Sequence, residues 1–392
     1  MQIDFFAEAA ALAPELTALR HAIHRRPELG NQEFETARQV ETYLQRCGLE
    51  TFRPLPTAVV GILRGNGAEK NAPCAALRAD MDALPLQERS GAPFASETPG
   101  VMHACGHDVH TAAALGAARL LSAHRAALCG EVRFLFQPDE EGSGGAQRMI
   151  DAGCLDGVGA VFGAHVSPAL PAGTVGVRYG KFYAASDTFS AAVLGKSAHG
   201  ATREAGVDAL VAAARMVTAV LALPDVFLPE RSVVSVGTLH AGTAGNILAD
   251  RAELSGILRT LGADTRAEMK RRFRQTLEKI AVETGTQLEL HLHESYGGIV
   301  NTEAETRLVQ ETAAALLGAA QVRVLDEPTM TTEDFGCLID AAGRGCFYHI
   351  GAGCACPLHS PDFLPDDSAV VTAAALHAAV LAAHLSRATS RQ

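Results

Sequence analysis

Apolar residues in the first part of the chain recur first at helical and then at strand spacing. Residues 5–29 carry an apolar residue every three or four positions from Leu12 to Ile23, which predicts a helix. Thr36–Cys47 predicts a second helix, which Gly48 closes. Short apolar runs and one Ala-rich stretch follow, and they predict strands at Val59–Leu63, Cys74–Leu77, Glu131–Phe136 and Val158–Ala164 and a helix at Thr111–His124.

A second, shorter alternation begins at Thr188. It runs strand, helix, strand, strand, helix, strand, with the elements Phe189–Leu194, Asp208–Leu223, Ser232–His240, Ala252–Thr260, Thr265–Thr284 and Gln287–Glu294. This order is the split α+β motif of ferredoxin-like units. The first pattern then returns, with helices at 303–317, 333–342 and 368–386 and a strand at Cys346–Ile350.

These patterns predict an α/β fold with an inserted domain. Strands that alternate with helices indicate a mixed, mostly parallel sheet flanked by helices, and we expect residues 1–183 and 297–392 to form this domain. The ferredoxin-like elements would form a separate domain, residues 184–296, inserted within it.

Composition narrows the class of protein. The chain has 392 residues, of which 48% are hydrophobic and 20% charged, as in globular proteins with a large core. The net charge of −11 argues against nucleic acid or an anionic membrane as partner. We find neither a leader-like N-terminus nor an apolar run long enough to span a membrane. Nine scattered cysteines, an odd number, indicate reduced thiols and a cytoplasmic location.

The segment Met102–His110 concentrates three His, one Cys and one Asp in nine residues, close to a predicted helix. Cys105 and His107 are residue types that bind zinc-like ions, and Gly106 lets the backbone bend so that both face one point. The alternative is a helix-capping loop in which Asp108 accepts backbone hydrogen bonds.

A second cluster follows the strand Glu131–Phe136, where Asp139, Glu140 and Glu141 stand in succession before a glycine. Acids at the carboxyl end of a parallel strand lie where α/β enzymes usually have their sites. One Glu can bind a metal while the other takes a proton from water. The alternative is a solvated acidic turn.

Four further residues carry weaker signals. His165 ends an apolar strand and His359 lies in a Pro-bounded loop, and a lone His in either place is more often structural. Asp80 and Asp82 are carboxylates at strand spacing that could orient a metal-binding His, or be ordinary loop acids. Gly-rich nucleotide loops and a G-x-S-x-G elbow are absent from the sequence. A Cys nucleophile at Cys105 would not need the two glutamates.

The combined motifs resemble the hippurate hydrolase and N-acyl-amino-acid amidohydrolase family. That family includes the plant auxin-conjugate hydrolases and belongs to the clan of acetylornithine deacetylase, succinyl-diaminopimelate desuccinylase and glutamate carboxypeptidase. The resemblance covers nearly the whole chain and follows the family's order of motifs. These are RADMDALP at 78–85, MHACGHDVHTA at 102–112, FQPDEEG at 136–142, GAHV at 163–166, GKSAHGA at 195–201, GTAGNILAD at 242–250, TTEDFG at 331–336 and LHSPDF at 358–363.

The resemblance implies metal-dependent hydrolysis of the amide bond of an N-acyl amino acid, such as a hippurate-, N-acetyl- or aryl-acetyl-amino-acid-like substrate. It implies two divalent ions, drawn from Zn, Mn, Co or Ni, with Cys105 as a bridging thiolate. The remaining metal ligands would be His107, Glu141, His165 and His359. Glu140 would serve as general base and acid.

The same resemblance assigns the inserted domain as a lid and dimerisation domain, which implies a homodimer or a higher homo-oligomer. His199 would help to polarise the scissile carbonyl, with a surface-loop His as the alternative. Asn246 and Arg259 would hold the substrate carboxylate, because the planar fork of an Arg binds a carboxylate at two points. An ordinary turn Asn and a solvated Arg are the alternatives to these two assignments.

Several features depart from the family pattern. Arg203 stands where many relatives have Pro and adds a charge near the lid loop, and Gly297-Gly298 stands where relatives often have Pro-Pro. Cys354 and Cys356 add two thiols just before the last predicted ligand. The sequence leaves three rivals open: a dipeptidase or carboxypeptidase with the same metal site, a catalytically silent binding protein, and a Cys hydrolase without metal.

Overall fold

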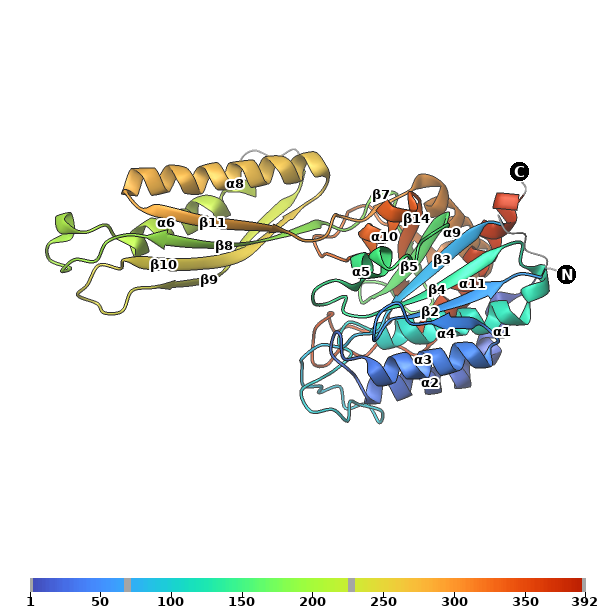
Figure 1. The fold of residues 1–392 in the computed structure, drawn as a ribbon. Helices are drawn as coiled ribbons and strands as arrows, with labels where there is room; N and C mark the ends of the chain where they lie inside the picture. Colours follow the sequence, from blue (N-terminus) through green and yellow to red (C-terminus); the bar gives the residue numbers. More distant parts are fainter. Residues whose placement is uncertain (1–2, 67–71, 225–229, 390–392) are drawn as a thin grey trace. The chain divides into compact units, whose positions relative to one another are not determined.

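The computed structural model describes residues 3–66, 72–224 and 230–389, and the chain divides into two compact units (Figure 1). The large unit comprises Met1–Gly180, Val300–Asp326 and Asp334–Gln392. The small unit comprises Lys181–Ile299 together with the short segment Glu327–Glu333. Backbone hydrogen bonds hold that segment to the small unit, among them one of 3.1 Å from Ala184 N to Thr331 O.

An eight-stranded sheet in the order β1-β2-β4-β3-β5-β14-β6-β13 forms the centre of the large unit. Its strands are β1 (Glu50–Phe52), β2 (Val59–Arg64), β3 (Cys74–Asp80), β4 (Glu131–Gln137), β5 (Ala160–Ser167), β6 (Val175–Val177), β13 (Val322–Val324) and β14 (Gly345–Gly351). The central strands β4, β3, β5 and β14 run parallel, whereas β1, β2 and the β6–β14 pair add antiparallel contacts. The sheet confirms the predicted mixed, mostly parallel class.

Helices cover both faces of this sheet. They are α1 (Phe5–Ala11), α2 (Ala13–Arg25), α3 (Phe34–Arg46), α4 (His107–Ala123), α5 (Gly145–Asp151), α9 (Glu303–Leu317), α10 (Phe335–Ala342) and α11 (Ser368–Thr389). In β14 the hydroxyl of Tyr348 lies 2.6 Å from His377 Nδ1 on α11, while the ring of Phe347 packs 4.7 Å from that of Phe335 on α10. Successive strand residues point to opposite faces, so α11 and α10 lie on opposite sides.

The C-terminal helix α11 corrects one expectation from the sequence. Between Ser368 and Ala388 it is long and apolar enough, by length and composition, to cross a membrane. Its most apolar stretch is 72% buried in the fold, however, and the helix packs along α4, as expected for a core helix. Counting only uninterrupted apolar runs missed it, because Thr372 and His377 interrupt the sequence without breaking the helix.

Helix boundaries differ from the prediction where proline acts. The predicted helix 5–29 breaks at Leu12, which caps α2, and Pro14 lies in the first turn of α2. Helix α2 ends at Arg25, because the residue before Pro27 is disfavoured in helical conformation.

Helix α4 begins four residues earlier than predicted, which places His107 on its first turn. The short strand β1 and the helix α5 were not predicted.

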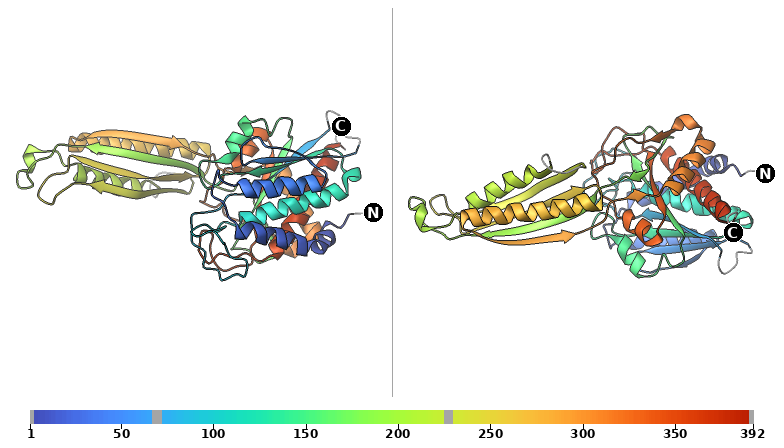
Figure 2. Two further views of the ribbon diagram at one scale, coloured as in Figure 1. Left: turned by 60° about the horizontal axis from the view of Figure 1, so that its bottom comes forward. Right: turned by 90° about the horizontal axis from the view of Figure 1, so that it is seen from above.

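The small unit confirms the predicted ferredoxin-like order. Its elements are β8 (Ala185–Leu194), α6 (Ala209–Leu221), β9 (Ser232–Ala241), β10 (Arg251–Thr260), α8 (Ala263–Thr284) and β11 (Gln287–Glu294). The sheet is antiparallel in the order β11-β8-β10-β9, and both helices pack on one face of it (Figure 2). In β11, Leu288, Leu290 and Leu292 pack into the core under these helices, and the intervening residues are exposed. The short strands β7 (Gly180–Lys181) and β12 (Val300–Asn301) complete the described strands.

Candidate metal centre

The predicted ligands of the large unit gather at one edge of its sheet. Glu140 and Glu141 follow β4, His165 lies near the end of β5, and His359 lies in the loop after β14. Because β4, β5 and β14 all run in one direction, their carboxyl ends meet at the same edge. The loop before α4 carries Cys105 to this edge.

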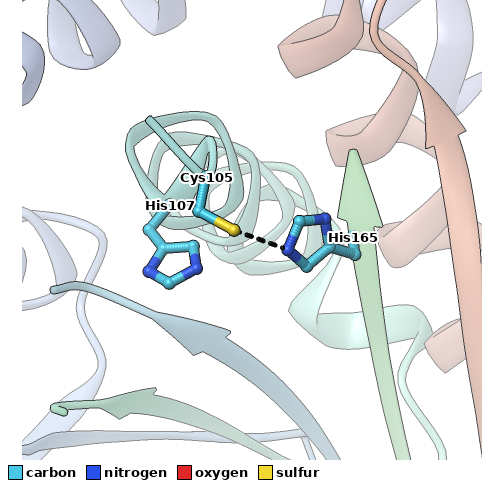
Figure 3. Close-up of side chains that lie close together, drawn as sticks. All are labelled: Cys105, His107 and His165. Atoms are coloured by element: carbon cyan, nitrogen blue, oxygen red, sulfur yellow. Dashed lines mark hydrogen bonds between the residues drawn. The ribbon is translucent and has the colours of Figure 1, made fainter. Parts of the chain in front are cut away.

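The side chains form overlapping groups, and within each group one potential ligand atom per residue lies within 4.8 Å of the others. These groups are Cys105, His107 and His165; Cys105, Glu141 and His359; and His107, Glu140 and Glu141. In Figure 3 the Cys105 sulfur faces the His165 ring, with Sγ 3.3 Å from Nε2. The structure therefore brings together the five predicted ligands and Glu140, and Cys105 belongs to two of the groups.

Two unusual backbone conformations shape the loops that carry these side chains. Gly106, the residue before α4, has φ 88°, and a Cβ there would lie 2.4 Å from Val166 Cγ2. Only glycine fits this turn without strain. His359 has φ 62°, and its N–H donates to the carbonyl of Ala104 at 2.8 Å. The loop of His359 is thus tied directly to the loop of Cys105.

His107 is oriented by Asp82. Its Nδ1 lies 2.8 Å from the Asp82 carbonyl oxygen and 3.1 Å from Oδ1, so the ring donates from Nδ1. The opposite nitrogen, Nε2, is buried, and no hydrogen-bond partner is found for it among the described residues. A buried ring nitrogen without a partner among the described residues, in a group of other donor atoms, has the chemistry of a cation ligand.

His165 and His110 form a second oriented pair. His165 Nδ1 lies 2.8 Å from the carbonyl of Val166, which leaves Nε2 to face Cys105. His110 accepts the N–H of Val166 at Nε2 (2.9 Å) and donates from Nδ1 to Asp80 (2.6 Å). Asp80 therefore contacts His110 and lies 3.8 Å from His107 Nε2, whereas Asp82 contacts a predicted ligand directly.

The electrostatics of the cluster suit a cation. Burial raises the pKa of Cys105 well above 9, and the Glu141 and Glu140 carboxylates raise it further. Burial holds the pKa of His165 well below 6.5, so its ring is neutral. Burial opposes ionisation of Glu141, but His359 and His107 outweigh it and lower the pKa of that carboxyl. Only a strong positive charge would turn Cys105 into a thiolate here, and a divalent ion supplies one. The donor set fits a metal site.

Sequence reasoning missed a buried ion cluster beside the metal loop. Asp108 accepts from Arg20 Nε at 3.0 Å and from His24 Nδ1 at 2.9 Å, and His24 Nε2 lies 3.2 Å from Glu88. Arg20 and His24 are fully buried, one turn apart on α2. Asp108 thus binds side chains and is not the backbone cap considered from the sequence. A pair of charged residues four apart on an apolar helix face was the available signal.

A second network of buried hydrogen bonds, centred on Asp334, was also not predicted from the sequence. Asp334, at the start of α10, accepts from Arg78 Nη2 at 2.8 Å and from Gln137 Nε2 at 2.7 Å. It also accepts the N–H of Ala146 at 3.0 Å. Arg78 is ion-paired with Asp80 as well, so the network links β3, β4, α5 and α10. Nothing in the local sequence pairs residues 78 and 334.

The remaining predicted residues lie in the small unit. His199 and Asn246 are exposed on two loops joined by a 2.8 Å hydrogen bond from Gly200 N to Asn246 O. Arg259, on β10, is half-buried and donates to Ser186 Oγ at 2.5 Å. Burial lowers the pKa of Arg259, and no described carboxylate of the small unit lies within ion-pair distance of it. Arg203 is exposed, 3.3 Å from Asp208.

The two extra thiols lie in the loop that also carries His359. Cys354 and Cys356 are both free and partly buried, and Cys354 Sγ lies 3.7 Å from the carbonyl of Cys356. This contact is local packing within the loop, and we assign no functional role to either thiol.

Comparison with known proteins identifies what this architecture is similar to. The profile of the family described as "Peptidase family M20/M25/M40" matches residues 76–383. The N-acetyl-L-cysteine deacetylase of Bacillus subtilis is 35% identical over 93% of this chain and 86% of its own length. The N-acyl-L-amino acid amidohydrolase of Geobacillus stearothermophilus is 39% identical over 73% of this chain and 78% of its own length. The crystal structure of the B. subtilis YXEP protein, described as a dinuclear metal-binding peptidase, is 34% identical with TM-score 0.86, covering 96% of this chain and 99% of its own.

Proposed function

The chain belongs to peptidase family M20/M25/M40, and we propose that it hydrolyses the amide bond of a small N-acyl amino acid. The observation that carries the proposal is the placement of Glu140. Its carboxylate lies 4.0 Å from His107 Nε2, in a cluster where the other five predicted residues offer ligand atoms. The two relatives described above carry names of this reaction type.

The proposed cofactor is a pair of divalent ions, drawn from Zn, Mn, Co or Ni. By the family resemblance Cys105 would be the thiolate shared between them, and His107, Glu141, His165 and His359 would complete the ligands. Each of these five residues offers an atom to at least one of the three-residue groups. When bound, such ions polarise a carbonyl and lower the pKa of water towards neutrality. Mixed thiolate, imidazole and carboxylate ligands do not select one metal.

Glu140 would carry the proton through the reaction. It takes a proton from water as the water oxygen forms a bond to the amide carbon, and it gives that proton to the leaving nitrogen as the C–N bond breaks. The products are a carboxylic acid and a free amino acid. His199 would donate a hydrogen bond to the carbonyl oxygen as charge develops on it.

Arg259 and Asn246 would hold the substrate carboxylate. The half-buried guanidinium of Arg259 has a neutral partner, Ser186, in the small unit, which leaves its charge available to an anion.

The small unit would act as a lid and as the dimerisation surface of a homodimer or higher oligomer. Light scattering of the purified protein tests the oligomer. We also propose a cytoplasmic location, which the nine free cysteines of the structure support.

The decisive experiment combines a substrate panel with metal analysis. The panel contains N-acetyl, N-benzoyl and aryl-acetyl amino acids, and dipeptides test the second candidate, a dipeptidase or carboxypeptidase, which the family description favours. We expect Glu140→Gln to lose at least about a hundredfold in kcat with unchanged metal content. The exposed Glu97→Gln is the matched control. Near-normal turnover of Glu140→Gln, or activity that survives complete metal removal, contradicts the proposal.

A further inference from the structure

The loop that carries Glu140 contains a residue, Asp139, whose left-handed backbone conformation needs stabilising contacts. Asp139, directly before Glu140, has φ 57°, a left-handed conformation that is uncommon for residues other than glycine, although Asn and Asp adopt it more readily than most. Its carboxylate lies between two glycines, since a Cβ added at Gly30 or at Gly142 would fall 2.1 or 2.2 Å from Asp139 Oδ1. Such conformations persist only when surrounding contacts impose them.

Besides Ser143 in its own loop and Arg148 on α5, the contacts to Asp139 come from the segment between α2 and α3. Asn31 Nδ2 donates to Asp139 Oδ2 at 2.7 Å, and the Asp139 N–H donates to Glu33 Oε1 at 2.9 Å. Glu33 is fully buried and Asp139 is 5% exposed. Asn31 is itself left-handed, with φ 64°, and its Oδ1 accepts from Arg148 Nη1 on α5 at 2.7 Å. We call Asn31, Glu33 and Asp139 the clasp.

The supporting segment is itself hydrogen-bonded to the start of α3. The Glu28 carboxylate accepts the N–H of Glu35 at 3.0 Å and that of Thr36 at 2.8 Å, in the first turn of α3. The segment that presents Asn31 and Glu33 is therefore fixed at its helical end. On the loop side, Ser143 N donates to Asp139 Oδ2 at 3.1 Å, which closes the turn around Glu140.

The other side of the loop has a separate anchor. The N–H of Glu141 donates to Asp82 Oδ2 at 3.0 Å, and the Glu141 side chain contacts His359 at 2.9 Å. Glu140 stands between this anchor and the clasp. Loss of a hydrogen bond in the clasp would therefore displace Glu140, while Asp82 and His359 would still hold Glu141, the proposed metal ligand.

We infer that Asn31 and Glu33 are positioning residues for the general base: through Asp139 they aim the Glu140 carboxylate. This inference rests on the proposed function, because it assigns Glu140 the role of base. Small displacements of a catalytic group can cost up to about a hundredfold in rate, so the clasp would act on kcat. Substrate affinity and metal content should not depend on it.

The test uses the metal-loaded full-length enzyme and variants that separate contact from backbone strain. Asn31→Gly removes the amide but keeps the left-handed backbone unstrained. Asn31→Asp keeps the shape but sets a carboxylate against Asp139. We expect kcat to fall roughly tenfold in Asn31→Gly and further in Asn31→Asp, with KM and metal content unchanged. Asn66→Ala, at an exposed Asn in the turn after β2, is the control.

A double-mutant cycle then identifies the route. In an Asp139→Gly background, which removes both the strain and the carboxylate, Asn31→Gly should have no further effect on kcat. Three results would overturn the inference. They are wild-type kcat in both Asn31 variants, a fall in kcat that parallels loss of metal, and additive effects of the two substitutions on kcat in the cycle. An active Glu140→Gln enzyme would instead refute the proposed function, so the two failures are distinguishable.

Discussion

Replacing His24 with Gln should remove an alkaline loss of stability that the wild-type protein shows. His24 is fully buried between Asp108 and Glu88. Burial opposes its charge, but the two carboxylates outweigh burial and raise the pKa of His24 from 6.5 to about 9. The folded protein therefore binds this proton more tightly than the unfolded chain does.

The size and pH window of the effect follow from that difference. Each pKa unit corresponds to about 1.4 kcal/mol, so protonated His24 contributes roughly 3 kcal/mol to the free energy of unfolding. A group with a raised pKa in the folded state contributes fully below its unfolded pKa, here 6.5. The contribution is lost as the pH rises through about 9. For a chain of this size, at roughly 1 to 2 °C per kcal/mol, the loss amounts to about 3 to 6 °C in Tm.

Thermal unfolding of metal-loaded protein across this window measures the effect. Metal loading matters because without a cation the pKa of His107 is also raised, to about 10, by Asp80 and Asp82 against the effect of burial. A bound metal takes His107 out of the titration. His21→Gln, a partly exposed histidine on the same helix, should keep the alkaline loss. An equal alkaline fall in Tm for His24→Gln and wild type would refute the reasoning.

Three further predictions concern the metal loop and its supports. Gly106→Ala should reduce metal content and lower Tm, because its Cβ would meet Val166 and the backbone is left-handed; unchanged metal content measured by mass spectrometry would contradict this. Asp334→Leu should destabilise the large unit by about 3 to 5 kcal/mol in urea unfolding, since it leaves Arg78 charged and buried without one of its partners; a change under about 1 kcal/mol would count against a structural role. Chelation should lower Tm and abolish activity together, with Zn or Mn restoring both, because the buried donors around Cys105 then lack a counter-charge; activity that persists without metal would favour a thiol mechanism.

The chemistry of the metal cluster was readable from the sequence. A Cys and several His around position 105, and adjacent glutamates after an apolar strand, are local patterns whose residue types bind metals and transfer protons. The strand and helix periods likewise predicted both architectures, since they depend on which side of each element faces a core. His165 and His359 were weaker, because each stands alone in its segment and acquires meaning only beside the others.

The supports of the cluster could not be predicted in the same way. Arg20 with Asp108, Arg78 with Asp334 and Asn31 with Asp139 are separated by 88, 256 and 108 residues. In the sequence each is an ordinary polar residue on a helix, strand or turn. Their pairing depends on how distant segments pack, which no local period encodes.

By itself, the sequence determined the two kinds of domain architecture and the residue types of the candidate ligands, because periodicity and motif composition are local properties. The assignment of Glu140 as the general base rests on the family resemblance and stays a prediction. Only the tertiary structure decided which buried charges neutralise one another, which ring nitrogen of His107 faces the cluster, and what holds Asp139 in a left-handed turn. Those outcomes depend on burial and on contacts between distant segments. The energy of a buried polar group is decided by its partners, and the fold supplies them.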